Sequence, residues 1–379
     1  MVSTSSPKIR VLVVDDAVVI RKIVTDALNK DPNIEVVGVA ANGKIALQKI
    51  PQCNPDIITL DVEMPEMNGI QTVGEIRKSY TKLPIVMFST LTERGASATL
   101  DALNAGANDY CTKPANVGSV GEARSRVEAE LINKIKSLCG RSEPKPPRQH
   151  EIQTPAPMHT SMPKQSKVAQ APVIRSASGL QDIQILCIGV STGGPNALAD
   201  LIPRLPGDLP VPIVCVQHMP PLFTGMLAQR LDAQSNITVV EATEGMILKP
   251  GCMYIAPGDY HLTIKRSGAE YVTALNQNPP ENSCRPAADP LFRSVVEHFG
   301  GHTLALILTG MGQDGFRGCE LVRQAGGQIV VQDEKTSVVW GMPGFVAEAG
   351  LHDVILPLDL IAPELVRRIQ RNKTQGLRN

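Results

Sequence analysis

Residues 185–198 read ILCIGVSTGGPNAL. The first part, residues 185–190, is a short apolar run of the kind that forms a strand buried on both faces of a parallel sheet. It passes directly into a glycine-containing turn and then into a helical pattern. Strand, tight turn and helix in this order are the repeating unit of α/β proteins, so this stretch predicts an α/β fold.

The rest of the C-terminal half repeats the alternation. Further apolar runs predict strands at 212–218, 237–242, 252–257, 303–310, 328–333 and 353–358. Helical patterns cover 195–205, 290–299 and 319–326. Two alternating segments, 261–266 and 271–276, are joined by SGAE and predict an antiparallel hairpin. We expect a mostly parallel α/β domain that carries this hairpin.

The N-terminal half has the same pattern on a smaller scale. Its predicted strands are 9–14, 34–40, 56–60, 84–89 and 109–113, and its amphipathic helices include 19–30, 70–80 and a last helix that ends near residue 140. This alternation predicts a parallel, doubly wound sheet. Prolines and polar residues fill the segment between the halves. We therefore predict a disordered N-terminus (1–7), a first domain (8–140), a proline-rich linker (141–181) and a second domain (182–379).

Composition limits the possible functions. The 379 residues carry a formal net charge of +0, which gives no general attraction to nucleic acid or to anionic membranes. Residues 1–7 lack the pattern of a signal peptide, and no apolar run is long enough to cross a bilayer. The eight cysteines stand singly, without the spacing of a zinc or redox site, and are expected to be buried free thiols. We expect a cytoplasmic monomer without membrane insertion or nucleic-acid partner.

Acidic residues gather at the predicted strand ends of the first domain. Asp15 and Asp16 follow the first strand, Asp61 follows the third and Lys113 follows the fifth. Carboxyl ends of parallel strands meet at one edge of the sheet. Clustered carboxylates repel one another unless a cation lies among them, and oxygen ligands suit Mg²⁺. Taken singly, these residues read as helix caps or loop residues; together they indicate a site where Asp61 is phosphorylated.

The motifs VVDD, LDVEMPEMNG, MFST and DYCTKP follow one another in order through this domain. In these motifs it resembles the response-regulator receiver family, which implies a flavodoxin-like sheet and Mg²⁺ as the cofactor of phosphorylation. The resemblance also implies a role for each matching residue: Asp61 as phospho-acceptor, Asp15, Asp16 and Asp61 as metal ligands together with the backbone carbonyl of Glu63, Ser89 as switch hydroxyl, Lys113 as phosphate contact and Tyr110 as the rotating aromatic.

Gly189, Ser191 and Gly193 fit the G-x-S-x-G pattern of a nucleophile elbow. Glycines permit the tight turn, and the helix that follows presents backbone N–H groups to a developing anion. A glycine loop that binds a phosphate or a dinucleotide would look similar at this place. The residues of this stretch alone leave both readings open.

A general base would decide between them. His218 ends the predicted strand 212–218, at the sheet edge where Ser191 lies. The third member of such a group is an acid at another strand end. Asp314 is modestly favoured over Asp333, and Asp259 reads as a turn residue. The remaining histidines of the domain lie at a helix end, in a loop or at the start of the hairpin, namely His298, His302, His352 and His261.

GVSTGGPNAL, QHMPPLFT, YIAPGDYHL and LTGMGQDG together resemble the chemotaxis protein-glutamate methylesterase family. The resemblance implies Ser191 as nucleophile, His218 as base and Asp314 as acid, with Thr192 and Met311 near the oxyanion and no cofactor for the esterase. The implied substrates are glutamyl methyl esters of chemoreceptors, with glutamine deamidation as a second activity. A chemotaxis histidine kinase is the implied phosphodonor, and the unphosphorylated receiver is expected to inhibit the enzyme.

Two other functions are also compatible with parts of the sequence. A C-terminal domain that only binds a nucleotide or DNA would have no need of His218 and Asp314, and the sequence contains no basic recognition helix. A hydrolase with a substrate outside chemotaxis would keep the same motifs. Labelling by a fluorophosphonate separates a hydrolase from a binding domain.

Overall fold

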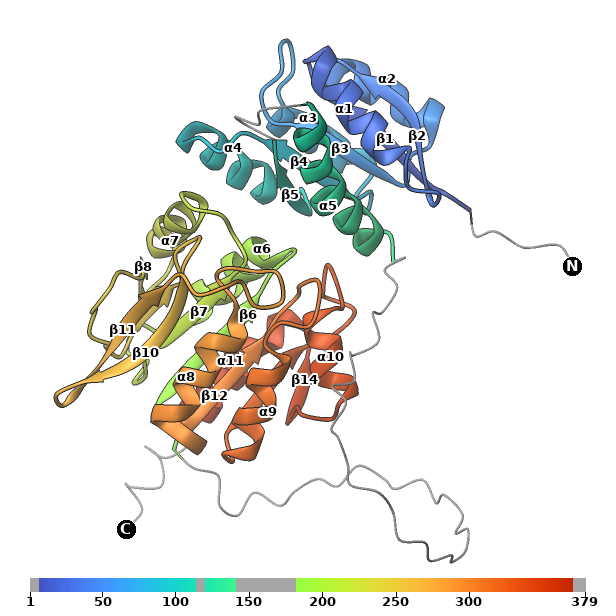
Figure 1. Cartoon of the computed structure of the whole chain (residues 1–379). Coiled ribbons are helices and arrows are strands. Elements are labelled where there is room, and N and C mark those ends of the chain that lie inside the picture. Colours follow the sequence, from blue (N-terminus) through green and yellow to red (C-terminus); the bar gives the residue numbers. More distant parts are fainter. Residues whose placement is uncertain (1–6, 114–119, 141–181, 371–379) are drawn as a thin grey trace, which may run out of the picture.

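The computed structural model describes residues 7–113, 120–140 and 182–370. These form two α/β units (Figure 1). The predicted N-terminal segment 1–7, apart from Pro7, and the whole predicted linker 141–181 lie outside the described residues. The domain boundaries proposed from the sequence therefore stay predictions.

The N-terminal unit is a five-stranded parallel sheet in the order β2-β1-β3-β4-β5. This is the flavodoxin-like order, so the predicted fold class is confirmed. Helix α1 packs with α5, while α2, α3 and α4 follow one another on the other face (Figure 1). The strands are β1 (Ile9–Val14), β2 (Ile34–Ala40), β3 (Ile57–Asp61), β4 (Ile85–Ser89) and β5 (Asp109–Thr112), and the helices are α1 (Val18–Leu28), α2 (Gly43–Cys53), α3 (Gly69–Ser79), α4 (Glu93–Asn104) and α5 (Val120–Leu138).

The C-terminal unit is a seven-stranded sheet in the order β14-β13-β12-β6-β7-β9-β8, and all of its pairings are parallel. The seven predicted strands are confirmed. They are β6 (Ile185–Val190), β7 (Ile213–Gln217), β8 (Thr238–Glu241), β9 (Cys252–Ile255), β12 (Thr303–Ile307), β13 (Gln328–Gln332) and β14 (Val354–Leu356). The predicted hairpin is also present and antiparallel, as β10 (His261–Ser267) and β11 (Glu270–Asn276).

Helices cover both faces of this larger sheet. On one face α8 packs with α9 and α9 with α10, and on the other α6 packs with α7 and α11. The predicted helix 195–205 ends its α-helical part at Leu201 and continues as a 3₁₀ turn, because Pro203 has no N–H for the helical ladder. The elements are α6 (Gly194–Leu201), η1 (Ile202–Arg204), α7 (Phe223–Gln234), α8 (Ala288–Phe299), η2 (Gly300–His302), α9 (Phe316–Gln324), α10 (Met342–Glu348) and α11 (Leu358–Gln370).

The strand order of the larger sheet indicates where along its edge a ligand site is expected. From β6 the chain passes to β7, then to the edge strand β8 and back to β9 between them, and later through β12, β13 and β14 on the other side of β6. The winding direction therefore reverses between β6 and β12. In open α/β sheets, ligands bind at the carboxyl ends of the strands beside such a switch point. Every residue of β6 and β12 is buried, which fixes the position of the loops that follow them.

The two units pack against each other through α4 and β5 on one side and α6 and α7 on the other. Tyr110 of β5 stacks on Phe223 of α7, with ring centroids 4.9 Å apart and planes at 9°. Asn196 of α6 donates from Nδ2 to the carbonyl oxygens of Leu103 and Ala107, at 3.1 and 3.2 Å. As a result, the apolar core under α4 and the core under α6 and α7 form one continuous cluster.

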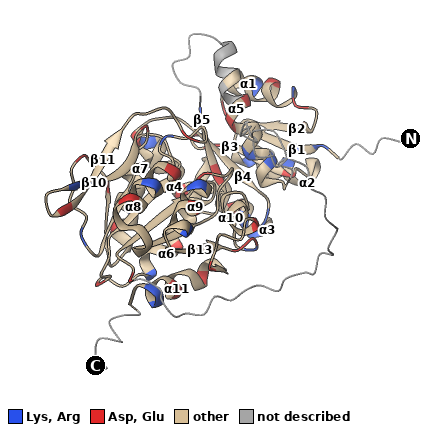
Figure 2. Cartoon of the chain, turned by 60° about the horizontal axis from the view of Figure 1, so that its bottom comes forward, with Lys and Arg blue, Asp and Glu red and all other residues tan. Residues whose placement is uncertain are grey.

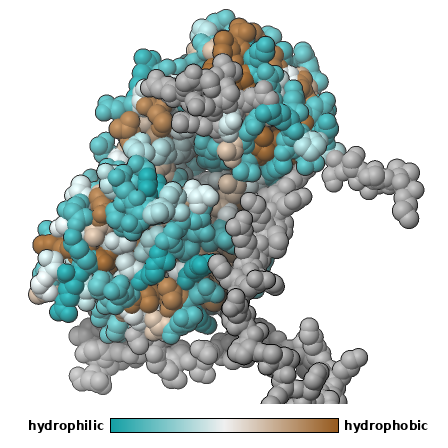
Figure 3. All heavy atoms as spheres, viewed as in Figure 1, coloured by the Kyte–Doolittle hydropathy of each residue, from teal (hydrophilic) through white to brown (hydrophobic). Residues whose placement is uncertain are grey.

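Charges of both signs alternate over the ribbon in Figure 2, in line with the net charge of +0. The face visible in Figure 3 is mostly hydrophilic, with separate small hydrophobic areas. Among the described residues, no helix is both long and apolar enough to cross a bilayer.

Candidate active site

Ser191 lies in the turn that joins β6 to α6. Gly193 immediately precedes this helix as its N-cap and has φ +78°, and a Cβ atom there would lie 2.5 Å from the side chain of Val338. A Cβ atom at Gly194 would lie 1.9 Å from Oε1 of Gln217. A larger residue would clash at both positions, so Gly193 of the motif and Gly194 after it are needed for this turn.

His218 and Asp314 meet at the switch point. His218 follows β7 and Asp314 follows β12, the two strands that flank β6 in the sheet. The distance between His218 Nε2 and Asp314 Oδ2 is 2.7 Å, and the side chains are 12% and 2% exposed. The predicted base and the predicted acid therefore form a buried pair beside the strand that ends in Ser191.

Asp314 is surrounded by hydrogen-bond donors. The backbone N–H groups of Ala288 and Asp289, at the start of α8, donate to it at 2.5 and 3.1 Å, and that of Gly315 donates at 3.0 Å. Asn282 adds its side-chain amide at 2.9 Å. Burial alone would raise the pKa of Asp314, but the hydrogen bonds from the imidazole and from these N–H groups keep it below the ordinary value. Asp314 is therefore a carboxylate at neutral pH.

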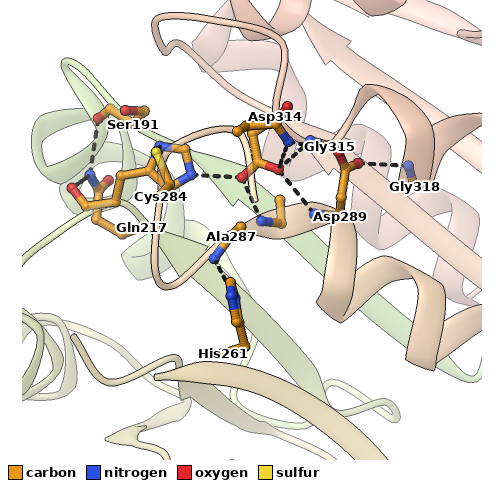
Figure 4. A network of polar contacts seen from close by, with 12 residues as sticks. Ser191, Gln217, His261, Cys284, Ala287, Asp289, Asp314, Gly315 and Gly318 are labelled. Carbon is orange, nitrogen blue, oxygen red and sulfur yellow. Dashed lines mark hydrogen bonds and ion pairs between the residues drawn. The ribbon is translucent and has the colours of Figure 1, made fainter. Parts of the chain in front are cut away.

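The ring of His218 has a second neighbour. When the ring is neutral, ionised Asp314 accepts from Nε2, so the other nitrogen, Nδ1, holds the lone pair. The sulfur of Cys284 lies 3.6 Å from Nδ1. Burial lowers the pKa of His218, but Cys284 and Asp314 outweigh it and raise that pKa to about 10. Within the described residues no hydrogen bond joins the Ser191 hydroxyl to the ring; the strand ends are linked through Gln217, whose amide donates to the Ser191 carbonyl at 3.1 Å (Figure 4).

The rival residues lie elsewhere. His261 is buried and bridges the N–H of Ala287 and the carbonyl of Pro279, at 3.3 and 3.2 Å. Asp333 accepts from the backbone of Thr336 within its own turn. The other candidates with described hydrogen bonds contact different parts of the chain, namely His298 on Ile264, His302 on Asp182 and Asp259 on Arg285. The structure thus brings Asp314, and not Asp333, to His218.

Thr192 lies in the same turn as Ser191, and Met311 lies in the loop after β12 that packs against this turn. Thr192 follows Ser191 directly, and its hydroxyl donates to Asp109 of the other unit at 3.0 Å. Met311 follows Gly310, where a Cβ atom would lie 2.8 Å from Cβ of Ser191. Across the described residues, the backbone N–H groups of Thr192 and Met311 have no hydrogen-bond acceptor.

The loop between β11 and α8 supplies two residues that the sequence did not reveal, Asn282 and Cys284. Half of the eight cysteines are buried as expected, but Cys284 is only partly buried and contacts the His218 ring. The segment ENSCRP has no strand or helix periodicity and no recognised motif, so only the folded chain brings it to the ring.

The smaller unit has its own cluster of acidic groups. Carboxylate oxygens of Asp15, Asp16 and Asp61 lie within 4.8 Å of one another. Lys113 Nζ lies 2.8 Å from both Asp15 and Asp61. Burial raises the pKa of Asp61 to about 6, although the lysine opposes this effect. One ammonium group therefore does not compensate the three carboxylates, and their oxygen atoms fit a hard divalent cation such as Mg²⁺.

A cavity of about 220 Å³ opens beside these carboxylates. Ser89 and Thr90 line it, and the buried Ser89 hydroxyl donates to the carbonyl of Gly95 at 3.1 Å. Glu63 also lines it; its N–H donates to Asp61 at 3.3 Å and its side chain pairs with Arg94. Tyr110 lies apart from the cavity lining, in the contact between the two units.

Both units match known families. A family model described as response regulator receiver domain matches residues 11–123, and one described as CheB methylesterase matches residues 186–365. Receiver domains generally bind Mg²⁺ for phosphorylation. Among solved structures, the CheB methylesterase catalytic domain of Thermotoga maritima is 45% identical, with a TM-score of 0.48, and covers 49% of this chain and 99% of that chain.

Relatives match nearly the whole chain. A protein-glutamate methylesterase/protein-glutamine glutaminase of a Nocardioides species is 53% identical over 367 residues, which are 97% of this chain and 97% of the relative. A protein of the same name from Trichodesmium erythraeum is 50% identical over 363 residues, which are 96% of this chain and 99% of the relative. Because the similarity spans both units, the chain belongs to the protein-glutamate methylesterase/protein-glutamine glutaminase family, a family of carboxylic ester hydrolases that carries a response regulator receiver domain.

Proposed function

We propose that the chain removes methyl groups from glutamyl methyl esters of chemoreceptors, releasing methanol, and that phosphorylation of its receiver activates it. The buried pair of His218 and Asp314 beside the Ser191 turn is the observation that carries the esterase assignment. A site that only binds a nucleotide has no need of such a pair. Methanol release from methylated receptor membranes, with and without a phosphodonor, tests the proposal.

Ser191 is the proposed nucleophile. Its hydroxyl attacks the ester carbonyl while Nδ1 of His218, the nitrogen that does not contact Asp314, takes the proton. The ionised Asp314 stabilises the resulting imidazolium. Methanol leaves with that proton, and water then hydrolyses the acyl-enzyme to a glutamate carboxylate.

Two backbone N–H groups are available for the negative charge that develops on the carbonyl oxygen. Those of Thr192 and Met311 flank Ser191 and have no acceptor within the described residues. Unpaired donors next to a nucleophile suit an oxyanion hole. The proposed ester hydrolysis needs no cofactor.

The same attack on a glutamine amide releases ammonia and gives the same acyl-enzyme, so we include receptor glutamines among the substrates. The chain is proposed to act as a monomer in the cytoplasm, where its free cysteines stay reduced. A chemotaxis histidine kinase is the proposed phosphodonor.

Asp61 is the proposed phospho-acceptor. Asp15, Asp16 and Asp61, with the backbone carbonyl of Glu63, would hold Mg²⁺, which shields the charge of phosphoryl oxygens when it is bound. Lys113, 2.8 Å from Asp61, is placed to contact a phosphoryl oxygen. Ser89 would exchange its hydrogen bond to Gly95 for one to the phosphoryl group.

The contact between the units supports control by the receiver. The Asp109 carboxylate accepts a hydrogen bond from the hydroxyl of Thr192, the residue next to the proposed nucleophile. It also forms an ion pair with Lys134 at 3.0 Å. Next to Asp109 in the sequence, Tyr110 is buried against Phe223. A change at Asp61 that moves β5 and α4 would therefore release the nucleophile turn.

Tyr110→Ala is expected to raise the methanol-release rate measured without phosphodonor. The aromatic stack contributes about 1 kcal/mol beyond burial, so the rate should rise roughly fivefold. Tyr80→Ala removes a tyrosine that is 37% exposed and serves as the matched control. An unchanged rate in a folded Tyr110→Ala protein would show that the stack of Tyr110 on Phe223 does not inhibit the enzyme.

The pH dependence of the reaction follows from His218. Only a neutral ring accepts the serine proton, and the raised pKa keeps the ring protonated at neutral pH. The value of kcat/KM should therefore rise with pH from 7 to 9, by up to about tenfold per unit. Cys284→Ala removes a contact that raises this pKa, so it should shift the rising limb to lower pH. A limb that stays in place would show that Cys284 does not influence the base.

A further inference from the structure

Two buried carboxylates lie side by side behind His218. Taken as whole residues, Asp289 is 2% exposed and Asp314 is 1% exposed. Figure 4 shows Asp314 between Cys284 on one side and Asp289 on the other. Burial, and to a smaller extent the charge of Asp314, raises the pKa of Asp289 to about 6. A second buried carboxylate here destabilises the folded state unless hydrogen bonds compensate its charge.

Each of the two carboxylates accepts hydrogen bonds from the start of the helix to which it does not belong. Asp314 precedes α9 but accepts the N–H groups of the first two residues of α8, Ala288 and Asp289. Asp289 belongs to α8 but accepts the N–H of Gly318, the third residue of α9, at 2.8 Å. Neither helix has a side-chain cap of its own. Each helix start is thus satisfied by a carboxylate from the other one, which fixes α8 and α9 relative to each other.

Asn282 joins the two carboxylates. Its Nδ2 lies 2.9 Å from Asp289 Oδ2 and 2.9 Å from Asp314 Oδ1. An amide nitrogen has two hydrogens, so it can donate to both carboxylates at once. An aspartate in its place would add a third negative charge and remove both donors. The residue has φ +52°, a region where asparagine is tolerated better than most side chains.

We propose that Asp289 and Asn282 are positioning residues of the esterase reaction, which hold Asp314 so that its Oδ2 stays on His218. The proposal rests on the proposed function, because it assigns Asp314 the role of acid partner. The Asp314 carboxylate has five hydrogen-bonding partners. One is His218, one is the Asn282 amide, one is the N–H of Gly315, and two are N–H groups of a helix start that the Asp289–Gly318 bond holds in place. Loss of this support lets the carboxylate rotate away from the ring.

The test uses the full chain with a phosphodonor and methylated receptor membranes. Asp289→Ala and Asn282→Ala are expected to lower kcat by roughly tenfold or more with KM within about twofold. Asp289→Asn keeps an oxygen for Gly318 and should recover part of the lost rate, whereas Asn282→Asp should be the slowest variant. The proton NMR signal of the His218–Asp314 hydrogen bond should shift upfield or broaden in both alanine variants.

Two controls separate positioning from folding. Asn278→Ala removes an exposed asparagine of the same loop, whose side chain has no hydrogen bond within the described residues. Asp353→Asn alters a carboxylate that also accepts a backbone N–H, that of Ile329, away from the site. Both should keep the wild-type kcat. If Asp289→Ala does not fold, Asn282→Ala, at an exposed position, decides the question alone.

Wild-type kcat and an unchanged NMR signal in Asn282→Ala would overturn the proposal. A fall in thermal stability with unchanged kcat in Asp289→Ala would do the same, since it would show a purely structural role. Ser191→Ala is measured in parallel. If that variant keeps a tenth of the wild-type rate or more, the proposed role of Ser191 as nucleophile fails; if it is inactive while the positioning variants keep full rate, only the positioning proposal fails.

Discussion

Ser191→Ala is expected to release methanol from methylated chemoreceptors at least about a thousandfold more slowly than the wild type, because removal of a serine nucleophile abolishes the acyl-enzyme route. KM should change little, since the substrate side chain is held by other groups. The hydroxyl makes no hydrogen bond within the described residues, so its loss leaves the fold intact. Methanol release measured at saturating receptor concentration gives the comparison directly.

Ser267→Ala is the matched control for this variant. Ser267 ends β10 on the exposed hairpin and lies outside the candidate site. Its substitution should leave the rate at the wild-type value. A Ser191→Ala protein that keeps a tenth of the wild-type rate or more would mean that another group, such as the Cys284 thiol, attacks the ester.

Asp61→Asn is expected to remove all stimulation by a phosphodonor. The amide cannot form an acyl phosphate, and the change takes one negative charge from the cluster with Asp15 and Asp16. The quantity to measure is the ratio of methanol-release rates with and without a small-molecule phosphodonor. This ratio should fall to about one in the variant, because the switch residues then receive no new charge.

Asp26→Asn provides the control for Asp61→Asn. Asp26 lies on the exposed side of α1 in the same unit and outside the carboxylate cluster. Its variant should be stimulated like the wild type. Stimulation that survives in Asp61→Asn would place the phosphorylation site at another residue.

The sequence predicted the strands better than the helices. The twelve strands of the two parallel sheets follow from short apolar runs and the hairpin follows from two alternating segments, because both patterns are clear local signals. Several helices were not predicted, among them α2, α7 and α11. Pro51 lies inside α2 and Pro363 inside α11, and Gly225 lies inside α7. Their stability comes from packing between elements rather than from their own residue preferences.

The site shows the same division. Ser191 and His218 stand at strand ends, where sheet geometry alone places them at one edge. Asp314 and Asp333 could not be separated by that rule, because both follow strands of the same sheet. The difference comes from the loop that precedes α8 and from the start of α8, which hold Asp314 next to the ring.

Contacts made by the loop 277–287 and by the opposing unit could not be predicted from the sequence. Cys284 and Asn282 reach the site from a segment without periodicity. The bond between Thr192 and Asp109 joins residues 83 positions apart. Such pairs depend on how two finished surfaces fit together, and a local pattern contains no information on that fit.

Labelling of the full chain with a fluorophosphonate, followed by mass spectrometry of its peptides, tests most directly whether Ser191 is a nucleophile controlled by the receiver. One label is expected, on Ser191, attached faster when the phosphodonor is present. A label on another residue, or no label under either condition, would contradict the account.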